Sequence, residues 1–399
     1  MTKKKKPPIM KKNDTDDRRM ESRRIYLDHA ATTPLDREVL EKMLPYYIEN
    51  FGNADSPHSF GRKAMTAVDI ARDKVAELLN AQPSEIYFTS GGTESDNWGI
   101  VGGALAMRKK GKTKVLMSNV EHHAALAAAE KLTSLGLEVV YLPVNASGRV
   151  EIETVRAALD ESVGLVCVMY ANNETGVVQP IKEIAELCKE KGSLFFTDCV
   201  QAAPHRKLDV KELGADMLAL SSHKFYGPKG VGVLYIKKGV SVEKFIAGGE
   251  QERGLRGGTL NVAGIVGLSA ALEKSMKELE EREAHILKLR EKFVKGVKEL
   301  GGVINGGEQG EGIAAVVNVR FDGVENAALL YNLDLKGIAV AAGSACASMS
   351  ILPSHVLSAM GLTNEQAKSS IRVSFGKGNT EEEVERVLEV IKATLEKIR

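Results

Sequence analysis

The sequence predicts an α/β protein in which a mostly parallel sheet is covered by helices on both faces. Short apolar segments alternate with amphipathic helical segments between about residues 86 and 236, as is typical of a parallel sheet with crossover helices. The 399 residues, 43% of them hydrophobic, suffice for two globular domains with separate cores. Polar clusters follow several predicted strands, where ligands bind in open α/β sheets.

The predicted elements begin with a short strand and a turn over Ile25–Pro34. Helices are expected at 35–50 and 59–80. The alternating part then has strands at 86–89, 115–118, 139–142, 163–169, 194–197, 217–220 and 231–236, and helices at 94–109, 122–135, 151–160 and 180–191. These strands form the predicted sheet.

A Glu/Lys-rich helical segment over about 268–300 ends this alternation. Strands near 313–320 and 370–375 follow. The last helix opens with a capping box from Thr380 to Glu383. It carries an apolar stripe of Val384, Val387, Leu388, Ile391 and Leu395, so we expect it to pack on a second, smaller core.

The composition bears on where the protein is located and on whether it binds nucleic acid or a membrane. The formal net charge is +1, but the first 24 residues hold ten Lys/Arg against four Asp/Glu. We read 1–22 as a disordered basic tail, because it lacks the apolar core of a secretory signal; a nucleic-acid-binding arm is the alternative reading. The chain has no apolar run of the roughly 18 residues that a membrane span requires.

The four cysteines, at 167, 188, 199 and 346, show no CxxC spacing. This predicts free thiols in a reducing cytoplasm, with neither a disulfide framework nor a metal site. We therefore expect a cytoplasmic protein with no membrane partner and no direct nucleic-acid partner.

The segment from Leu220 to Gly232 is the first candidate for chemistry. It places Ser221, His223 and Lys224 directly after an apolar strand and before a Gly/Pro turn. A lysine at the mouth of a buried strand pair is poorly solvated, which lowers its pKa and leaves an amine able to attack a carbonyl. A surface lysine after a strand is the alternative.

Residues after two further strands could bind a phosphate and a pyridine ring. The turn Thr89–Glu94 contains Gly92 and Thr93 before a helix, and free N–H groups there can hold a phosphate; a plain Gly-rich turn is the alternative. Asp198, with Gln201 three residues on, closes another strand. A carboxylate there can pair with a protonated pyridine nitrogen, whereas an ordinary helix N-cap is the alternative.

Three more residues stand out by their surroundings. His122 follows a strand and could transfer protons beside a cofactor ring, or be a surface histidine. Cys346 lies among small and polar residues, which indicates a mobile, partly exposed loop presenting a thiol; a buried core cysteine is the alternative. Arg372 falls in an apolar strand, where it could bind a substrate carboxylate or form an internal salt bridge.

Together these motifs resemble the cysteine desulfurases of the NifS/IscS type, in the class V aminotransferase group of fold-type I pyridoxal-phosphate enzymes. The resemblance runs from about Ile25 to the C-terminus. It rests on ordered segments that include Phe-Thr-Ser-Gly-Gly-Thr-Glu-Ser-Asp-Asn, Glu-His-His, Asn-Asn-Glu-Thr-Gly, Thr-Asp-Cys-Val-Gln, Ser-Ser-His-Lys, Arg-Gly-Gly-Thr, Gly-Ser-Ala-Cys and Ser-Ser-Ile-Arg.

The resemblance implies a role for each matching residue. Lys224 would bind pyridoxal phosphate covalently, Asp198 would pair with its ring nitrogen, and His122 would stack on the ring. Asn173 and Gln201 would contact the ring hydroxyl, and Arg372 with Asn173 the substrate carboxylate. Cys346 would be the nucleophile that takes the sulfur. The phosphate would be held by Gly92, Thr93, Ser221 and His223, with Thr259 reaching it from the partner subunit.

The implied reaction converts L-cysteine to L-alanine and leaves a persulfide on Cys346. A homodimer would pass this sulfur to an acceptor such as an iron–sulfur scaffold protein, or to tRNA thiolation. The implied large domain covers 34–267 with a seven-stranded sheet. The implied small α+β domain combines 23–33 with 268–399 and carries the Cys346 loop.

Rival interpretations are a transaminase, which does not need Cys346, a selenocysteine lyase, and a non-enzymatic scaffold that kept only the fold. The chain ends directly after its last helix. The longer tail of IscS proteins, which helps to bind the scaffold, is therefore not seen here, which looks more NifS-like.

Overall fold

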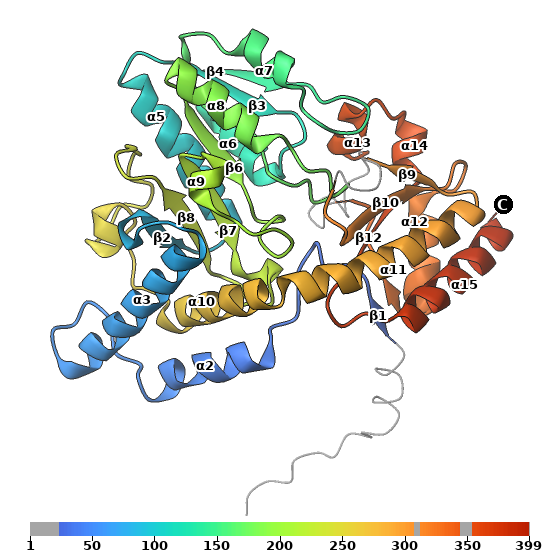
Figure 1. Ribbon diagram of the computed structural model, residues 1–399, viewed down its shortest axis with the longest axis horizontal. Helices are drawn as coiled ribbons and strands as arrows, with labels where there is room; N and C mark the ends of the chain where they lie inside the picture. The colour runs from blue at the N-terminus through green and yellow to red at the C-terminus, as the bar shows by residue number, and fades with distance from the viewer. Residues whose placement is uncertain (1–23, 307–311, 344–352, 399) are drawn as a thin grey trace, which may run out of the picture.

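The computed structural model describes residues 24–306, 312–343 and 353–398. The predicted tail 1–22 and Cys346 lie outside the described residues. A seven-stranded sheet forms the centre of one half of the molecule (Figure 1), with strand order β2-β8-β7-β6-β5-β3-β4. Its strands are β2 (Ile86–Thr89), β3 (Lys114–Ser118), β4 (Glu138–Leu142), β5 (Val163–Cys167), β6 (Leu194–Asp198), β7 (Met217–Ser221) and β8 (Gly232–Ile236).

This sheet is mostly parallel, as predicted. Strand β8 runs antiparallel to both of its neighbours, β2 and β7, whereas the pairs from β7 through β6, β5 and β3 to β4 are all parallel. Strand β2 therefore points the same way as the parallel strands. The carboxyl ends of β2, β3, β5, β6 and β7 meet at one edge of the sheet, where a ligand is expected.

Helices cover both faces of this sheet because successive strand residues point to opposite sides. Val166 packs into one core with helices on its side, and its neighbour Leu165 packs into the other. The first face is covered by α2 (Arg37–Ile48), α3 (Ser59–Leu78), α7 (Ile152–Ala158), α8 (Ile181–Lys191), α9 (Val210–Leu213) and α10 (Val262–Lys277). The second is covered by α4 (Gly92–Asn97), a π-helical turn at Trp98–Gly102, α5 (Gly103–Arg108) and α6 (His123–Ser134).

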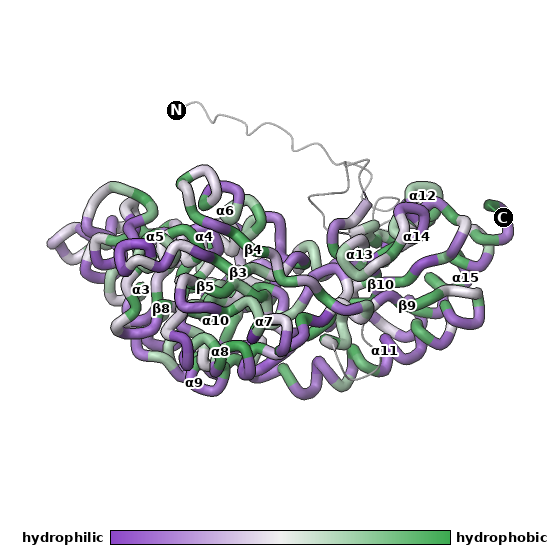
Figure 2. Tube along the Cα trace, turned by 90° about the horizontal axis from the view of Figure 1, so that it is seen from above, coloured by the Kyte–Doolittle hydropathy of each residue, from purple (hydrophilic) through white to green (hydrophobic). Residues whose placement is uncertain are grey.

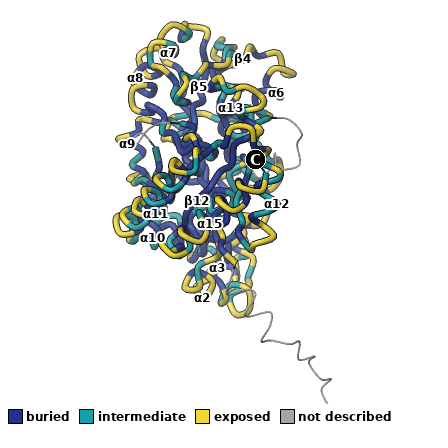
Figure 3. Tube along the Cα trace, turned by 90° about the vertical axis from the view of Figure 1, so that its right-hand side faces the viewer, coloured by how far each residue is buried: buried dark blue, intermediate teal, exposed yellow. Residues whose placement is uncertain are grey.

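A second module has its own sheets and core. Strands β12 (Ser370–Ser374), β10 (Val316–Arg320) and β9 (Val303–Asn305) form an antiparallel sheet, and β1 (Ile25–Tyr26) pairs with β11 (Ile338–Ala339). Its core includes side chains of α11 (Leu279–Glu299), α12 (Asn326–Leu335) and α15 (Glu381–Ile398). Two short helices, α13 (His355–Ala359) and α14 (Asn364–Lys368), complete it. In Figures 2 and 3 hydrophobic, buried chain runs through the interior, and exposed segments lie at the periphery.

Most predicted elements form within a few residues of their expected bounds, and the capping box of the last helix is present. Thr380 and Glu383 exchange hydrogen bonds of 3.2 and 3.3 Å. The helical segment expected over about 268–300 forms as two helices: α10 starts earlier, at Val262, and α10 and α11 meet at Glu278. The proposed domain boundaries stay a prediction.

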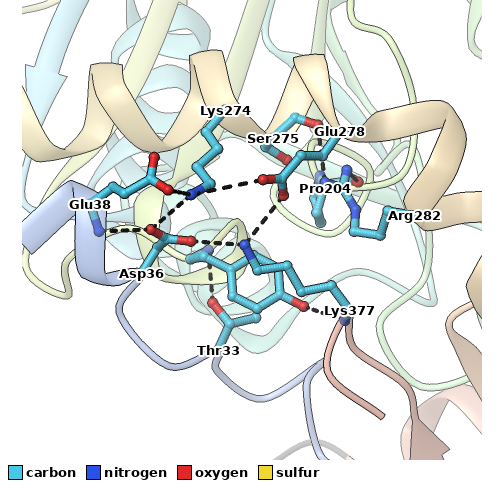
Figure 4. Close-up of polar contacts among 10 residues, drawn as sticks. Thr33, Asp36, Glu38, Pro204, Lys274, Ser275, Glu278, Arg282 and Lys377 are labelled. Carbon is cyan, nitrogen blue, oxygen red and sulfur yellow. Dashed lines mark hydrogen bonds and ion pairs between the residues drawn. The ribbon is translucent and has the colours of Figure 1, made fainter. Parts of the chain in front are cut away.

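Ion pairs surround this helix junction (Figure 4). Asp36, just before α2, accepts from Lys377 at 2.8 Å and from Lys274 of α10 at 3.2 Å. Lys377 also reaches Glu278, at 3.2 Å. The network therefore ties the junction to segments from both ends of the chain. Among the described residues, no helix is long and apolar enough to cross a membrane.

Candidate active site

A cavity of about 220 Å³ opens at the carboxyl edge of the large sheet. Ten of the predicted site residues line it, namely Gly92, Thr93, His122, Asn173, Asp198, Gln201, Ser221, His223, Lys224 and Arg372. They come from five strand ends of the large sheet and from β12 of the second module. Residues separated by 280 positions in sequence are thus brought to one site.

Lys224 follows β7 in a short turn, Ser222–Lys224. Its Nζ donates to the carbonyl oxygens of Ala30 and Ala31, at 2.6 and 2.9 Å. Thr33 fixes the same segment, because its amide and hydroxyl both donate to the carbonyl of His223 at 2.9 Å. The segment after β1 therefore lies against the lysine, a contact that the sequence alone did not indicate.

Asp198 ends β6 and is buried in the cavity wall. Its Oδ1 accepts the N–H of Val200 at 2.8 Å, and burial raises the pKa of its carboxyl to about 6 despite that bond and the nearby charge of Lys224. At neutral pH Asp198 is therefore an anion at a poorly solvated position. Such a group strongly favours a cationic partner.

His122 is the N-cap residue of α6, and its Nδ1 accepts the N–H of Ala124 at 3.2 Å. Burial, followed by the charge of Lys224, lowers the pKa of this imidazole to about 4. The ring is therefore neutral at pH 7. Because Nδ1 accepts a hydrogen bond, the ring proton resides on Nε2.

The turn after β2 is held rigidly. The amide of Ser90 donates to Glu94 at 2.8 Å, and the Thr89 and Ser95 hydroxyls lie 2.7 Å apart. Arg256 forms two hydrogen bonds to Glu94, of 2.8 and 3.2 Å. Burial alone would raise the pKa of Glu94, but the bonds from Arg256 and Ser90 outweigh it, so the pKa is lowered. The Arg-Gly-Gly-Thr segment is thereby anchored beside Gly92 and Thr93, while Thr259 itself is exposed and outside the cavity lining.

Arg372 extends from β12 of the second module and is almost fully buried. Its Nη2 lies 2.7 Å from Asp28 Oδ1, and its Nη1 donates to the carbonyl of Asn173 at 2.9 Å. The internal salt bridge considered for this arginine is therefore present. The same side chain also lines the cavity.

Sequence reasoning missed several lining residues: Ala30, Ala31, Asp96, Met169 and Val200. The alanines and Val200 carry no chemical signal, and they contribute backbone groups and shape. Asp96 did stand inside a quoted motif, four residues after Gly92, but nothing local indicated that it faces the cavity.

Comparison with known proteins identifies the family. The model of the family described as "Aminotransferase class-V" matches residues 25–387. The chain belongs to the aminotransferase class-V family. The resemblance inferred from the motifs is thus confirmed, as is the α/β fold class.

Curated class-V relatives align over nearly the whole chain. One named "Cysteine desulfurase IscS" from Methanosarcina thermophila is 47% identical over 95% of this chain and 94% of its own length. Another of that name, from Clostridium botulinum, is 48% identical over 93% and 94%. These relatives belong to an enzyme class that depends on pyridoxal phosphate.

Solved structures of class-V proteins superpose closely. A "NIFS-LIKE PROTEIN" aligns with a TM-score of 0.88 at 39% identity and covers 94% of this chain and 99% of its own. A structure titled "SspA in complex with cysteine" aligns with a TM-score of 0.79 at 36% identity, over 89% of this chain and 100% of its own. The fold is therefore that of solved proteins of this group.

Proposed function

We propose that this chain is a pyridoxal-phosphate-dependent cysteine desulfurase, which releases L-alanine from L-cysteine and retains the sulfur as a persulfide on Cys346. The observation that carries the proposal is the convergence of Lys224, Asp198, His122 and Arg372 on one cavity. A lysine, a buried carboxylate and a neutral imidazole are the groups that pyridoxal phosphate uses in catalysis. We expect the persulfide sulfur to serve iron–sulfur cluster assembly or tRNA thiolation.

The residues present fit the cofactor. Oε1 of Gln201 is buried and has no partner among the described residues, so it is available to the ring hydroxyl. The first N–H groups of a helix have no intrahelical partner, and those of Gly92 and Thr93 would hold the phosphate together with Ser221 and His223. When bound, pyridoxal phosphate supplies a conjugated ring that accepts the electron pair left on the substrate carbon.

Each protein group then has a physical task. With the cofactor bound, Lys224 would hold its carbonyl carbon, and the Asp198 carboxylate would favour a proton on the ring nitrogen. His122 would lie against the ring, with its own proton at Nε2. His223 stays neutral, since burial lowers the pKa of its imidazole to about 4, and its Nδ1 is 3.0 Å from the Thr32 hydroxyl. It can therefore donate to a phosphate oxygen without a net charge.

Arg372 is proposed to bind the substrate carboxylate. Its Nε is buried without a partner among the described residues, and a guanidinium binds carboxylates through two parallel hydrogen bonds. Asp28 already neutralises one side of the guanidinium, so the incoming carboxylate must compete with or share that pairing. Asn173 lies beside it, because its carbonyl accepts from Nη1 at 2.9 Å.

A homodimer is proposed from an exposed apolar surface on α2 and α3. The side chains that form it, which we call the α2–α3 surface, are Leu40, Leu44, Tyr47, Ile48, Phe51, Phe60 and Ile70. Such a patch marks an interface, and a second copy would also bring in Thr259 as the missing phosphate contact. Ile48→Glu should give monomers in sedimentation velocity, whereas the exposed Leu335→Glu should not; an unchanged dimer in the Ile48 variant would contradict this surface.

The central experiment follows alanine and sulfide from L-cysteine with a reductant. Wild type should form both, Lys224→Ala should neither hold the cofactor covalently nor turn over, and Cys346→Ala should hold the cofactor but lose sulfide production. A Cys346 variant that still turns over would favour the transaminase, and a strong preference for selenocysteine would favour the lyase. The three described cysteines are buried free thiols, which supports a reducing, cytoplasmic setting.

A further inference from the structure

Asp28 forms an ion pair with Arg372, the arginine proposed to bind the substrate carboxylate, and the proposed function gives this aspartate no task. Its Oδ1 lies 2.7 Å from Nη2 of Arg372, and the two side chains are 19% and 1% exposed, Asp28 first. Arg372 lines the cavity, whereas Asp28 is not among the lining residues. Asp28 therefore bonds the guanidinium without taking up space in the cavity wall, so a ligand carboxylate need not displace it.

Two hydrogen bonds fix the orientation of the Arg372 guanidinium. Asp28 accepts from Nη2, and the carbonyl oxygen of Asn173 accepts from Nη1 at 2.9 Å. A guanidinium has five N–H groups, so three remain after these two bonds, and Nε has no partner among the described residues. Two fixed points on a planar group leave it little freedom to rotate. The arginine is thus oriented before a carboxylate arrives, which lowers the entropic cost of binding one.

The same aspartate begins a tight turn that reaches Lys224. The amide of Ala31 donates to the Asp28 carbonyl at 3.0 Å, which is the hydrogen bond of a β-turn and brings the two Cα atoms within about 7 Å. The Tyr26 hydroxyl donates to the same carbonyl at 3.0 Å and braces the turn. Nζ of Lys224 donates to the Ala31 carbonyl at 2.9 Å. One turn therefore contacts the carboxylate-binding arginine through its first residue and the lysine through its last.

We propose that Asp28 is a positioning residue for the substrate: its carboxylate holds the Arg372 guanidinium in the orientation that receives the substrate carboxylate, at a distance from Lys224 that the turn sets. This inference rests on the proposed function, because the arginine needs that orientation only if an amino acid binds. Asp28 acts through Arg372 and touches neither substrate nor cofactor. An ion pair that served stability alone would have no selective effect on ligands that carry a carboxylate.

The test measures the binding of two amines to the cofactor-loaded protein, from the change in its visible absorption. L-Alanine is the proposed product and carries the carboxylate, whereas ethylamine is the same molecule without it. Asp28→Ala should weaken L-alanine binding about tenfold or more, as for the loss of a hydrogen bond to a charged group, and leave ethylamine binding within about threefold of wild type. Asp28→Asn keeps an oxygen that can accept from Nη2, so it should bind L-alanine at most about threefold more weakly than wild type.

The stability of the apoproteins separates positioning from a purely structural role. Asp28→Ala and Asp28→Asn both remove the counterion of a buried arginine, so both should lower the melting temperature. Only Asp28→Ala should weaken L-alanine binding. The matched control is Asp322→Asn, because Asp322 pairs with Arg320 at 3.0 Å in the same module and neither residue lines the cavity. This control should change neither dissociation constant.

Turnover of L-cysteine gives a further readout. In Asp28→Ala the KM should rise about tenfold while kcat stays within about threefold of wild type, because a carboxylate far from the breaking bond is bound equally in the ground state and in the transition state. A fall in kcat at unchanged KM would contradict the proposed role, since it would place the defect at the reacting atoms.

Defined binding results overturn the inference. Wild-type affinity for L-alanine in Asp28→Ala would mean that the ion pair serves stability alone, and equal weakening for both amines would place the defect at the lysine. Asp28→Asn as damaging as Asp28→Ala would mean that charge acts and hydrogen-bond geometry does not. If Asp28→Ala does not fold, Asp28→Ser, whose hydroxyl is too short to replace the carboxylate, takes its place with the same expected results. Failure of the wild-type protein to bind pyridoxal phosphate or L-alanine would instead refute the proposed function.

Discussion

Removing the charge of Glu252 should destabilise the protein far more than removing that of Glu243, although both glutamates form ion pairs of similar length. Glu252 Oε1 lies 2.7 Å from Arg72 Nη2, and Glu243 Oε1 lies 2.6 Å from Lys109 Nζ. The side chains of the first pair are 12% and 0% exposed, Arg72 first, and those of the second pair 70% and 36%, Lys109 first. If distance alone mattered, removing either glutamate charge would lower the free energy of unfolding equally. Burial predicts a larger loss for the buried pair.

The magnitude follows from what each substitution leaves behind. Glu252→Gln leaves the Arg72 guanidinium buried without its counterion, and losing one partner of a buried pair costs about 3–5 kcal/mol. Arg72 keeps its 2.7 Å bond to the Ile86 carbonyl and its position over the Phe88 ring, so we expect the lower end, about 3 kcal/mol. Glu243→Gln removes an exposed pair, worth about 0.5 kcal/mol.

Equilibrium urea unfolding of the two apoproteins measures this difference. Trp98 is the one tryptophan of the chain and is buried against the seven-stranded sheet. Its fluorescence therefore reports on the unfolding of the half of the molecule that contains this sheet. The double variant Arg72→Met/Glu252→Gln should lose less stability than the two single losses combined, because it strands no charge. Equal free-energy losses in Glu252→Gln and Glu243→Gln would refute the reasoning from burial.

Three other predictions follow from local geometry. A methyl group on Gly232 would lie 2.6 Å from the Leu220 carbonyl oxygen and 2.7 Å from the Gly91 Cα. Gly232→Ala should therefore lower the free energy of unfolding by about 1–3 kcal/mol and weaken cofactor binding, as measured by titration. Gly378 has open space around it, so Gly378→Ala should change neither quantity. Burial lowers the pKa of His29 to about 4, so between pH 6.5 and 4 the unfolded chain binds a proton there that the folded chain does not. The free energy of unfolding should therefore fall as the pH drops from about 6.5 toward 4, by at most about 3 kcal/mol. His29→Gln should show a flatter dependence of the melting temperature on pH, and a dependence identical to that of wild type would contradict this. Lys377→Met removes contacts to two carboxylates and should cost about 1 kcal/mol at low salt, with the loss shrinking as salt screens the pairs; a salt-independent loss would argue for packing instead.

The local pattern sufficed for the strands and for the residues at their ends. Asp198, Lys224 and His122 could be placed together because parallel strands bring their carboxyl ends to one edge, and each is a polar residue within a few positions of the end of an apolar run. Arg372, which belongs to a different sheet, stood out as an arginine in an apolar strand, and the family motifs then related it to the same site.

What the sequence could not supply are pairings over long separations and the details of junctions. Nothing near Arg72 indicates that its partner is residue 252, and nothing near Ala30 indicates that its carbonyl accepts from Lys224. Glu278 also sits in a continuous run of helix-forming residues, so local propensity predicts no break there. These features are decided by packing between segments, which periodicity does not contain.

The helices α10 and α11 run one after the other along the molecule and belong to different cores (Figure 1). The two helices meet at Glu278, which therefore lies where the large sheet's helical layer passes into the second module. Arg372 lies on β12 of the second module, and Lys224 follows β7 of the large sheet. The cavity is therefore complete only when the two modules are packed together, because Arg372 and Lys224 line it from different modules.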